Sequence, residues 1–179
     1  MKGTIVASRY AKSLLDLSIE QNVLDKVNND MVDLSGTCAG SEDLRSLLNN
    51  PTVNSTKKGE IFTALFGGKM EKISLDFIQL ITENSREDLL PTIAQSFTKL
   101  YKAHNNIVEV ELISATPLAD DTKSNILDKV KADYKNASFE INEIIDPAIL
   151  GGFIVKIGDK QLDSSVASQL TNLKNILLN

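Results

Sequence analysis

Histidine and cysteine, the two residue types that most often serve as base and nucleophile, occur once each in these 179 residues. A catalytic thiol needs a nearby histidine and a third group that orients it. Cys38 lies near the predicted end of a helix, so we interpret it as a small, partly buried structural residue. His104 stands beside a predicted domain junction without an obvious partner, so we expect neither a catalytic nor a metal-binding role for it. One cysteine also excludes an internal disulfide.

The glycine-rich segments do not have the spacing of nucleotide-binding loops. The run FGGK at residues 66–69 has a glycine pair before a lysine, but the G-x-x-x-x-G-K-[ST] spacing is absent and Met70 replaces the hydroxyl residue. The pair Gly151-Gly152 lacks the G-x-G-x-x-G pattern and opens a predicted strand rather than a helix. No phosphate or dinucleotide site is therefore expected, and no cofactor is predicted.

Two pairs of neighbouring carboxylates are explained by helix starts. Glu87-Asp88 and Asp120-Asp121 lie where helices are expected to begin, and negative charge is favourable at that end of the helix dipole. No set of catalytic or metal-ligating residues remains, so the sequence predicts a protein that is not an enzyme.

Charge and hydropathy exclude two further classes. The net charge is −5, whereas nonspecific nucleic-acid binding requires an excess of lysine and arginine, so no nucleic-acid partner is expected. Residues 1–105 hold 12 basic and 13 acidic residues, and residues 106–179 hold 7 and 11. The acidic second half favours either a basic partner surface or solubility alone. No apolar run approaches the roughly 20 residues that span a bilayer, and the N-terminal region resembles neither a signal nor a transit peptide.

The first part of the chain has the periodicity of a six-helix bundle. Asn, Ser and Gly residues separate the apolar-periodic segments, and Pro91 is compatible only with a first helical turn. The predicted helices cover residues 4–21, 23–37, 42–48, 55–66, 71–83 and 86–104.

After Asn105 the apolar period changes from 3.6 to 2, which predicts a small α/β domain. We therefore divide the chain into residues 1–105 and 106–179. Strands are expected at 107–113, 138–145 and 151–157, with a possible return strand at 161–163. Helices are expected at 120–134 and from Ser164 or Ser165 to the end. The glycines Gly151, Gly152 and Gly158 are interpreted as structural, at a strand start and a tight turn.

The first and fifth helices have wider apolar faces than one core contact needs. At 100° per residue, each apolar arc covers roughly 220°, whereas that of the sixth helix covers roughly 140°. The surplus predicts either a groove for an amphipathic partner helix or two central helices buried nearly all round. The predicted groove residues are Tyr10, Leu14 and Leu17 on one wall and Phe77, Ile78 and Ile81 on the other.

Several motifs resemble those of one known family. Residues 145–160 read IDPAILGGFIVKIGDK, followed by LDSSV at 162–166. Residues 7–14 read ASRYAKSL, and residues 83–86 read ENSR, where the family has a glycine in place of Ser85. Together these resemble, over essentially the whole chain, the delta subunit of F-type ATP synthases, whose mitochondrial relative is the oligomycin-sensitivity-conferring protein. One departure is that DSSVASQL, at 163–170, lacks the two arginines of the family pattern.

The resemblance implies a mechanical, non-catalytic role in the peripheral stalk, or stator. The helical domain would bind the N-terminal segments of alpha subunits, and the second domain would bind the C-terminal ends of the b subunits. Proton flow would thereby be coupled to ATP synthesis elsewhere in the complex. The expected place is the cytoplasmic face of a bacterial inner membrane, as a peripheral protein without self-oligomerisation, and a plastid relative is also compatible. A generic helical scaffold, an RNA-binding bundle and a small enzyme are the alternatives.

Overall fold

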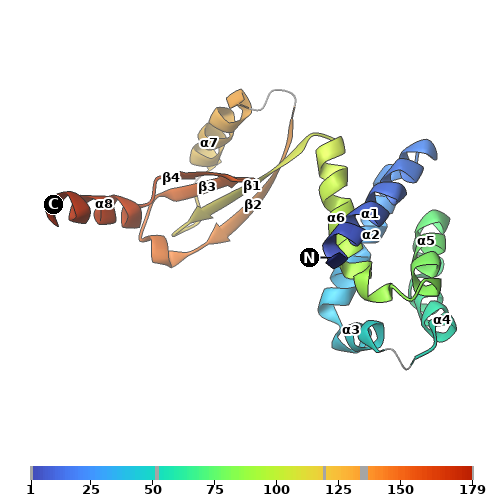
Figure 1. Ribbon diagram of the computed structural model, residues 1–179. Helices are drawn as coiled ribbons and strands as arrows, with labels where there is room; N and C mark the ends of the chain where they lie inside the picture. Colours follow the sequence, from blue (N-terminus) through green and yellow to red (C-terminus); the bar gives the residue numbers. More distant parts are fainter. Residues whose placement is uncertain (1, 51–52, 119, 134–136, 179) are drawn as a thin grey trace. The chain divides into compact units, whose positions relative to one another are not determined.

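A computed structural model of the chain describes residues 2–50, 53–118, 120–133 and 137–178. The chain forms two compact units, Met1–Lys102 and Ala103–Asn179. The division lies close to the boundary expected at Asn105. Helices dominate the first unit, and the second contains a small mixed sheet with helices (Figure 1), so the expected mainly helical class with a small α/β part is correct.

Helices α1 to α6 belong to the first unit. Their bounds are α1 (Lys2–Glu20), α2 (Leu24–Gly40), α3 (Glu42–Asn49), α4 (Ser55–Phe66), α5 (Lys72–Glu83) and α6 (Leu90–His104). Side-chain caps explain two of the starts: Ser41 Oγ accepts from Leu44 N at 3.2 Å, and Asn54 Oδ1 accepts from Thr56 N at 3.3 Å. The sixth helix begins later than predicted because residues 87–89 form the short 3₁₀ helix η1 (Glu87–Leu89). Pro91 therefore lies in the first turn of α6, where its missing N–H costs no hydrogen bond.

One apolar core joins these helices, and small residues allow α1 to approach its neighbours. Its members are fully buried and come mainly from α1 (Ala7, Ala11, Leu14), α2 (Val27, Met31, Leu34), α5 (Ile78, Ile81) and α6 (Ile93, Ala94, Phe97). Cys38 also belongs to this core, more deeply than expected, and its burial raises the pKa of the thiol. A thiol with a raised pKa carries less thiolate and is a poor nucleophile.

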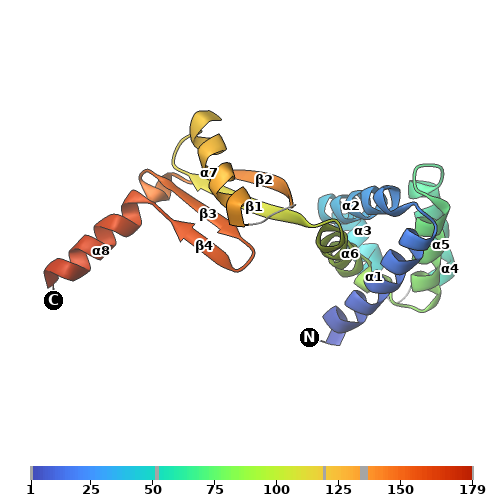
Figure 2. The same cartoon turned by 90° about the horizontal axis from the view of Figure 1, so that it is seen from above.

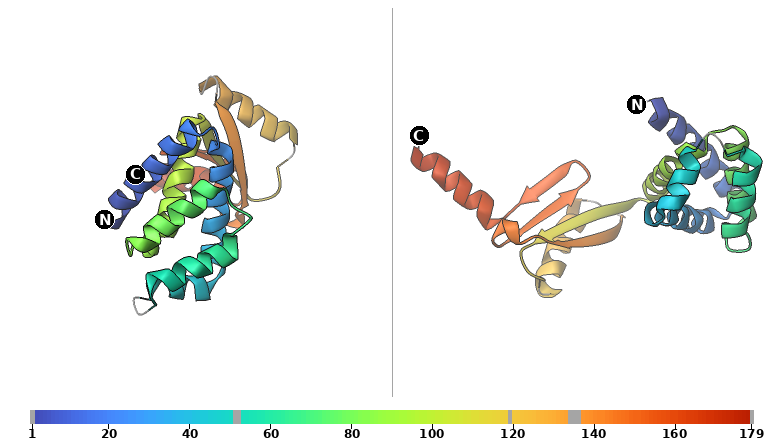
Figure 3. Two further views of the ribbon diagram at one scale, coloured as in Figure 1. Left: turned by 90° about the vertical axis from the view of Figure 1, so that its right-hand side faces the viewer. Right: turned by 90° about the horizontal axis from the view of Figure 1, so that it is seen from below.

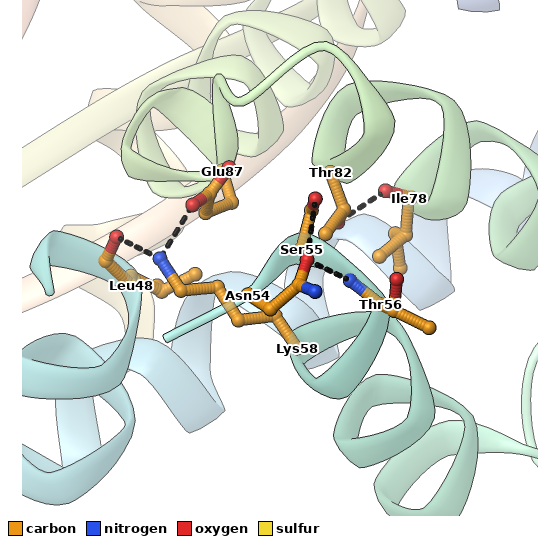
Figure 4. Close-up of polar contacts among 8 residues, drawn as sticks. All are labelled: Leu48, Asn54, Ser55, Thr56, Lys58, Ile78, Thr82 and Glu87. Carbon is orange, nitrogen blue, oxygen red and sulfur yellow. Dashed lines mark hydrogen bonds and ion pairs between the residues drawn. The ribbon is translucent and has the colours of Figure 1, made fainter. Parts of the chain in front are cut away.

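A buried ion pair connects α4 to η1. Lys58 Nζ lies 2.5 Å from Glu87 Oε1 and also donates to the Leu48 carbonyl oxygen at 3.3 Å (Figure 4). The Lys58 side chain is 1% exposed and the Glu87 side chain 11%. This single cation therefore connects the end of α3, the first turns of α4 and the segment before α6. The sequence did not suggest it, because Lys58 lies in the polar run STKKGE.

The second unit contains a four-stranded sheet in the order β2-β1-β3-β4. The strands are β1 (Ile107–Ser114), β2 (Ser138–Ile145), β3 (Phe153–Ile157) and β4 (Lys160–Asp163). Strand β1 pairs in parallel with β2, and α7 (Asp120–Asp133) forms the crossover between them. Strand β3 pairs antiparallel with both of its neighbours, β1 and β4. The predicted helix end at Tyr134 lies outside the described residues. Strand β3 begins at Phe153, two residues later than predicted.

Helix α7 covers one face of this sheet (Figures 1 and 2). Val110 and Leu112 of β1 and Val155 of β3 point to that face and pack against Ile126 and Val130 of α7. Because side chains alternate along a strand, Glu109, Glu111 and Ile113 point to the opposite face. The alternating polarity of β1 predicted this arrangement, in which one face of the sheet is covered and the other is more polar.

A tight turn between β2 and β3 explains why β3 begins late. Asp146 Oδ1 accepts from Ala148 N at 2.9 Å and opens the 3₁₀ helix η2 (Pro147–Ile149). Gly152 follows with a φ of +75°, in the left-handed region that favours glycine. A Cβ at this position would meet the Ser164 carbonyl oxygen at 2.3 Å. The backbone therefore requires glycine at position 152.

Candidate functional site: a groove between α1 and α5

A groove opens between the end of α1 and the first turns of α5. Its volume is about 500 Å³, and its lining residues are Leu17, Gln21, Lys72, Ile73, Asp76, Phe77 and Leu80. Leu17 is 42% exposed and Leu80 is 50% exposed, whereas Phe77, which also lines the groove, is almost fully buried. The groove thus has two apolar edges, an aromatic floor and a charged rim formed by Lys72 and Asp76.

The structure brings only part of the predicted set to this groove. Leu17 and Phe77 line it. Leu14, Ile78 and Ile81 are at most 1% exposed and belong to the core, so they do not form the open walls that the sequence suggested. The reason is that most of the wide apolar arcs of α1 and α5 is buried in contacts within the unit. Only the outer edges of these arcs remain accessible.

Tyr10 lies beside the groove and joins α1 to the segment after α5. Its ring packs edge-to-face against Phe77, with centroids 6.4 Å apart and planes at 73°. Arg86 Nη1 donates to the Tyr10 hydroxyl at 3.0 Å, and the Arg86 guanidinium carbon is 5.8 Å from the ring centroid. Arg86 thus holds the Tyr10 side chain, and the Tyr10 ring packs against Phe77. Tyr10 therefore supports the floor of the groove.

Sequence reasoning missed two apolar liners, Ile73 and Leu80. Both belong to the apolar arc of α5, so the helical period did identify them as apolar surface. The period could not say which edge of that arc would remain open, because that depends on the positions of α1 and the other helices. The exposed fraction of Leu80 supplies this information.

A buried carboxylate on α2 fixes the start of α5. Asp30 Oδ2 accepts from Glu71 N at 3.0 Å and from Ser74 Oγ at 2.5 Å. Lys26, one turn earlier on α2, pairs with Glu71 at 2.6 Å. Asp30 therefore acts as an N-terminal cap from another helix and helps hold the α5 wall of the groove in place. Burial raises the pKa of the Asp30 carboxyl above its ordinary value, although the hydrogen bond from Ser74 opposes this effect.

Replacing Asp30 with asparagine should remove a pH dependence of stability. Because its pKa is raised in the folded state, Asp30 contributes most below the ordinary aspartate value of about 4, and its contribution falls as pH rises through the raised value. As the pH rises through the raised pKa, wild type loses stability that Asp30→Asn does not lose. The free energy of unfolding of Asp30→Asn, relative to that of wild type, should therefore increase with pH. Urea denaturation at a series of pH values measures it.

The control is Asp30→Ala, which removes the acceptor for Ser74 and Glu71 and should be less stable than Asp30→Asn at every pH. A difference between wild type and Asp30→Asn that stays constant with pH would contradict a buried carboxylate with a raised pKa.

Outside this groove, the parts of the chain that the structure describes contain no cluster of residues suited to catalysis or metal binding. Among those residues, no group of three or more His, Cys, Asp or Glu side chains is placed to hold a metal ion. Cys38 is buried and His104 is exposed. None of the described helices is long and apolar enough to cross a bilayer. The described parts of the chain thus form a helical unit with an open apolar groove, followed by a small α/β unit.

Comparison with known proteins identifies the family to which this chain belongs. The family described as ATP synthase delta (OSCP) subunit matches residues 6–177. The ATP synthase subunit delta of Cytophaga hutchinsonii is 38% identical over 98% of this chain and 95% of that protein, and the one from Synechococcus elongatus is 34% identical over 92% and 91%. The chain therefore belongs to the ATP synthase delta (OSCP) subunit family, whose members are non-catalytic structural subunits of the complex.

The fold agrees with this assignment. A chain of the Toxoplasma gondii mitochondrial ATP synthase hexamer superimposes with a TM-score of 0.73, with 97% of each chain covered and 19% sequence identity. At this identity the comparison speaks for the fold alone. Since nearly the whole of both chains is covered, both units have counterparts in that structure.

Proposed function

We propose that this protein is the stator adaptor that holds the catalytic head of an F-type ATP synthase to its peripheral stalk. Residues 1–105, as a six-helix bundle, bind the N-terminal segments of alpha subunits. Residues 106–179 bind the C-terminal ends of the b subunits. The protein works at the cytoplasmic face of a bacterial inner membrane, where it resists rotation of the head and so couples proton flow to ATP synthesis.

The observation that carries the first contact is the groove between α1 and α5. Leu17 of α1 and Leu80 of α5 are each close to half exposed, and the buried Phe77 lines the same groove. Apolar edges contributed by two helices, with an aromatic floor, fit the apolar stripe of an amphipathic helix. A partner helix of three or four turns would bury about 800 Å² on each side, which is the size of a specific interface.

Two substitutions at the edges of the groove test this contact. We expect Leu17→Asp and Leu80→Asp each to weaken binding of a synthetic alpha-subunit N-terminal peptide about ten-fold or more, because each places a charge against the apolar stripe. Isothermal titration calorimetry measures the affinity. Both side chains are close to half exposed, so the thermal midpoint should change little, unlike that of variants at the buried Phe77.

Val32→Asp is the matched control, since Val32 is 48% exposed on α2 and does not line the groove. It should bind the peptide as tightly as wild type. The groove assignment fails if Leu17→Asp and Leu80→Asp also bind normally.

A further inference from the structure

The motif ENSR ends helix α5 and places an arginine at a defined point. Asn84 Nδ2 donates to the Leu80 carbonyl oxygen at 2.8 Å, and Ser85 is left-handed with a φ of +53°. Arg86 N then donates to the Ile81 carbonyl oxygen at 3.1 Å, which completes a Schellman motif. The position of Arg86 in this motif frequently carries an apolar residue that packs back on the helix. Ending the helix therefore does not by itself explain the arginine.

The Arg86 side chain reaches from the end of α5 to Tyr10 on α1. Its Nη1 donates to the Tyr10 hydroxyl, and its guanidinium carbon lies 5.8 Å from the ring centroid. The hydrogen bond uses one of the five N–H groups of the guanidinium. Arg86 is exposed, and among the described residues no carboxylate lies within ion-pair distance of it. The side chain is thus held in place with most of its donors open, and a guanidinium matches the geometry of a carboxylate.

Tyr10 places this guanidinium beyond one end of the groove between α1 and α5. Tyr10 and Leu17 are seven residues apart on α1, so they lie on the same side of the helix, about 10 Å from each other. The Tyr10 ring also packs against Phe77, which lines the groove. The two helices run side by side along this surface (Figure 3). A helix that occupies the groove and continues along α1 therefore passes Tyr10 and reaches Arg86.

The charges around the groove give its two ends opposite character. Along α1, the exposed charged side chains that the structure describes change from basic to acidic, in the order Arg9, Lys12, Asp16 and Glu20. Arg86 adds a further positive charge beside the basic half. At the other end, the rim residues Lys72 and Asp76 offset each other. Complementary charges fix the register of a bound partner, so the basic end favours a partner helix with an acidic residue there.

We infer that Arg86 binds a carboxylate of the helix that occupies the groove between α1 and α5. The ligand is an aspartate or glutamate side chain, about two turns along the partner helix from the apolar residue that contacts Leu17 and Leu80. This ion pair sets the register and the direction in which the partner helix binds, which the apolar groove alone does not specify. The inference rests on the proposed contact with the N-terminal segments of alpha subunits, and it adds a charged group that their recognition requires.

The experiment titrates the full-length protein with the synthetic alpha-subunit N-terminal peptide, in which each acidic residue is replaced in turn by its amide. We expect Arg86→Gln to weaken binding of the unmodified peptide about ten-fold. One of the amide peptides should bind wild type more weakly by a similar factor, yet lose little further affinity for Arg86→Gln, because groups in contact do not contribute independently. The matched control is Lys57→Gln, at an exposed position on α4 that does not line the groove, which should bind as wild type does.

The outcomes separate the role of Arg86 from that of the groove. If wild type does not bind the peptide, the proposed alpha contact is wrong and the inference falls with it. If Leu17→Asp weakens binding and Arg86→Gln does not, the groove stands and the inference is overturned. If Arg86→Gln weakens binding but every amide peptide loses affinity equally for this variant and for wild type, Arg86 acts only by holding Tyr10, and the inference is again overturned.

Discussion

Replacing Lys58 with methionine should destabilise the helical unit by about 3–5 kcal/mol, because it leaves Glu87 charged, buried and without its cation. Methionine preserves most of the apolar stem of the lysine, so lost packing contributes little. Among the described residues, Glu87 Oε2 has no hydrogen-bond partner, and Lys58 is the partner of Oε1. For a unit of roughly 100 residues, this loss should lower the thermal midpoint by more than about 10 °C in a circular-dichroism melt.

Two further variants separate the ion pair from a general effect of charge. Lys57→Met, at the exposed neighbouring position, should change stability by less than about 0.5 kcal/mol. The double variant Lys58→Met with Glu87→Leu should recover most of the loss, because both charges are then absent from the interior. If the double variant is no more stable than Lys58→Met alone, the ion pair is not what couples α4 to η1.

Replacing Gly152 with alanine should cost about 3 kcal/mol or more, which is a large effect for one added methyl group. The new Cβ would lie 2.3 Å from the Ser164 carbonyl oxygen, far inside van der Waals contact. Ser164 is not free to move away, because its N–H donates to the Phe153 carbonyl oxygen at 3.0 Å. Relief would therefore require β3 and β4 to separate at this end of the sheet.

Gly158→Ala is the matched control for this clash. Gly158 also has a positive φ, of +55°, but a Cβ there would meet nothing within 4 Å. Its substitution should cost only the conformational penalty of about 1 kcal/mol. Urea denaturation of both variants, combined with amide hydrogen exchange along β1, reports the difference in the second unit. Equal stability of the two variants would show that the close approach at Ser164 is not rigid.

The sequence by itself determined most of the helices and strands. The change of apolar period after Asn105 predicted the α/β unit, and the alternation at 138–145 predicted the bounds of β2. These predictions succeed because local patterns select helix or strand wherever one face must be buried. The family motifs at 145–166 were also recognisable from the sequence alone, because a tight turn that requires glycine restricts the residue types at its positions.

Only the tertiary structure decided which apolar and charged residues are accessible. Leu14 and Leu17 lie on the same wide arc of α1, yet one is in the core and the other edges the groove. Lys58 and Lys57 are adjacent in a polar run, yet one is buried in an ion pair and the other is exposed. In each case the local pattern is the same, and the difference arises from which neighbouring helix packs against that side. Burial depends on contacts between segments far apart in the chain, and no local period contains that information.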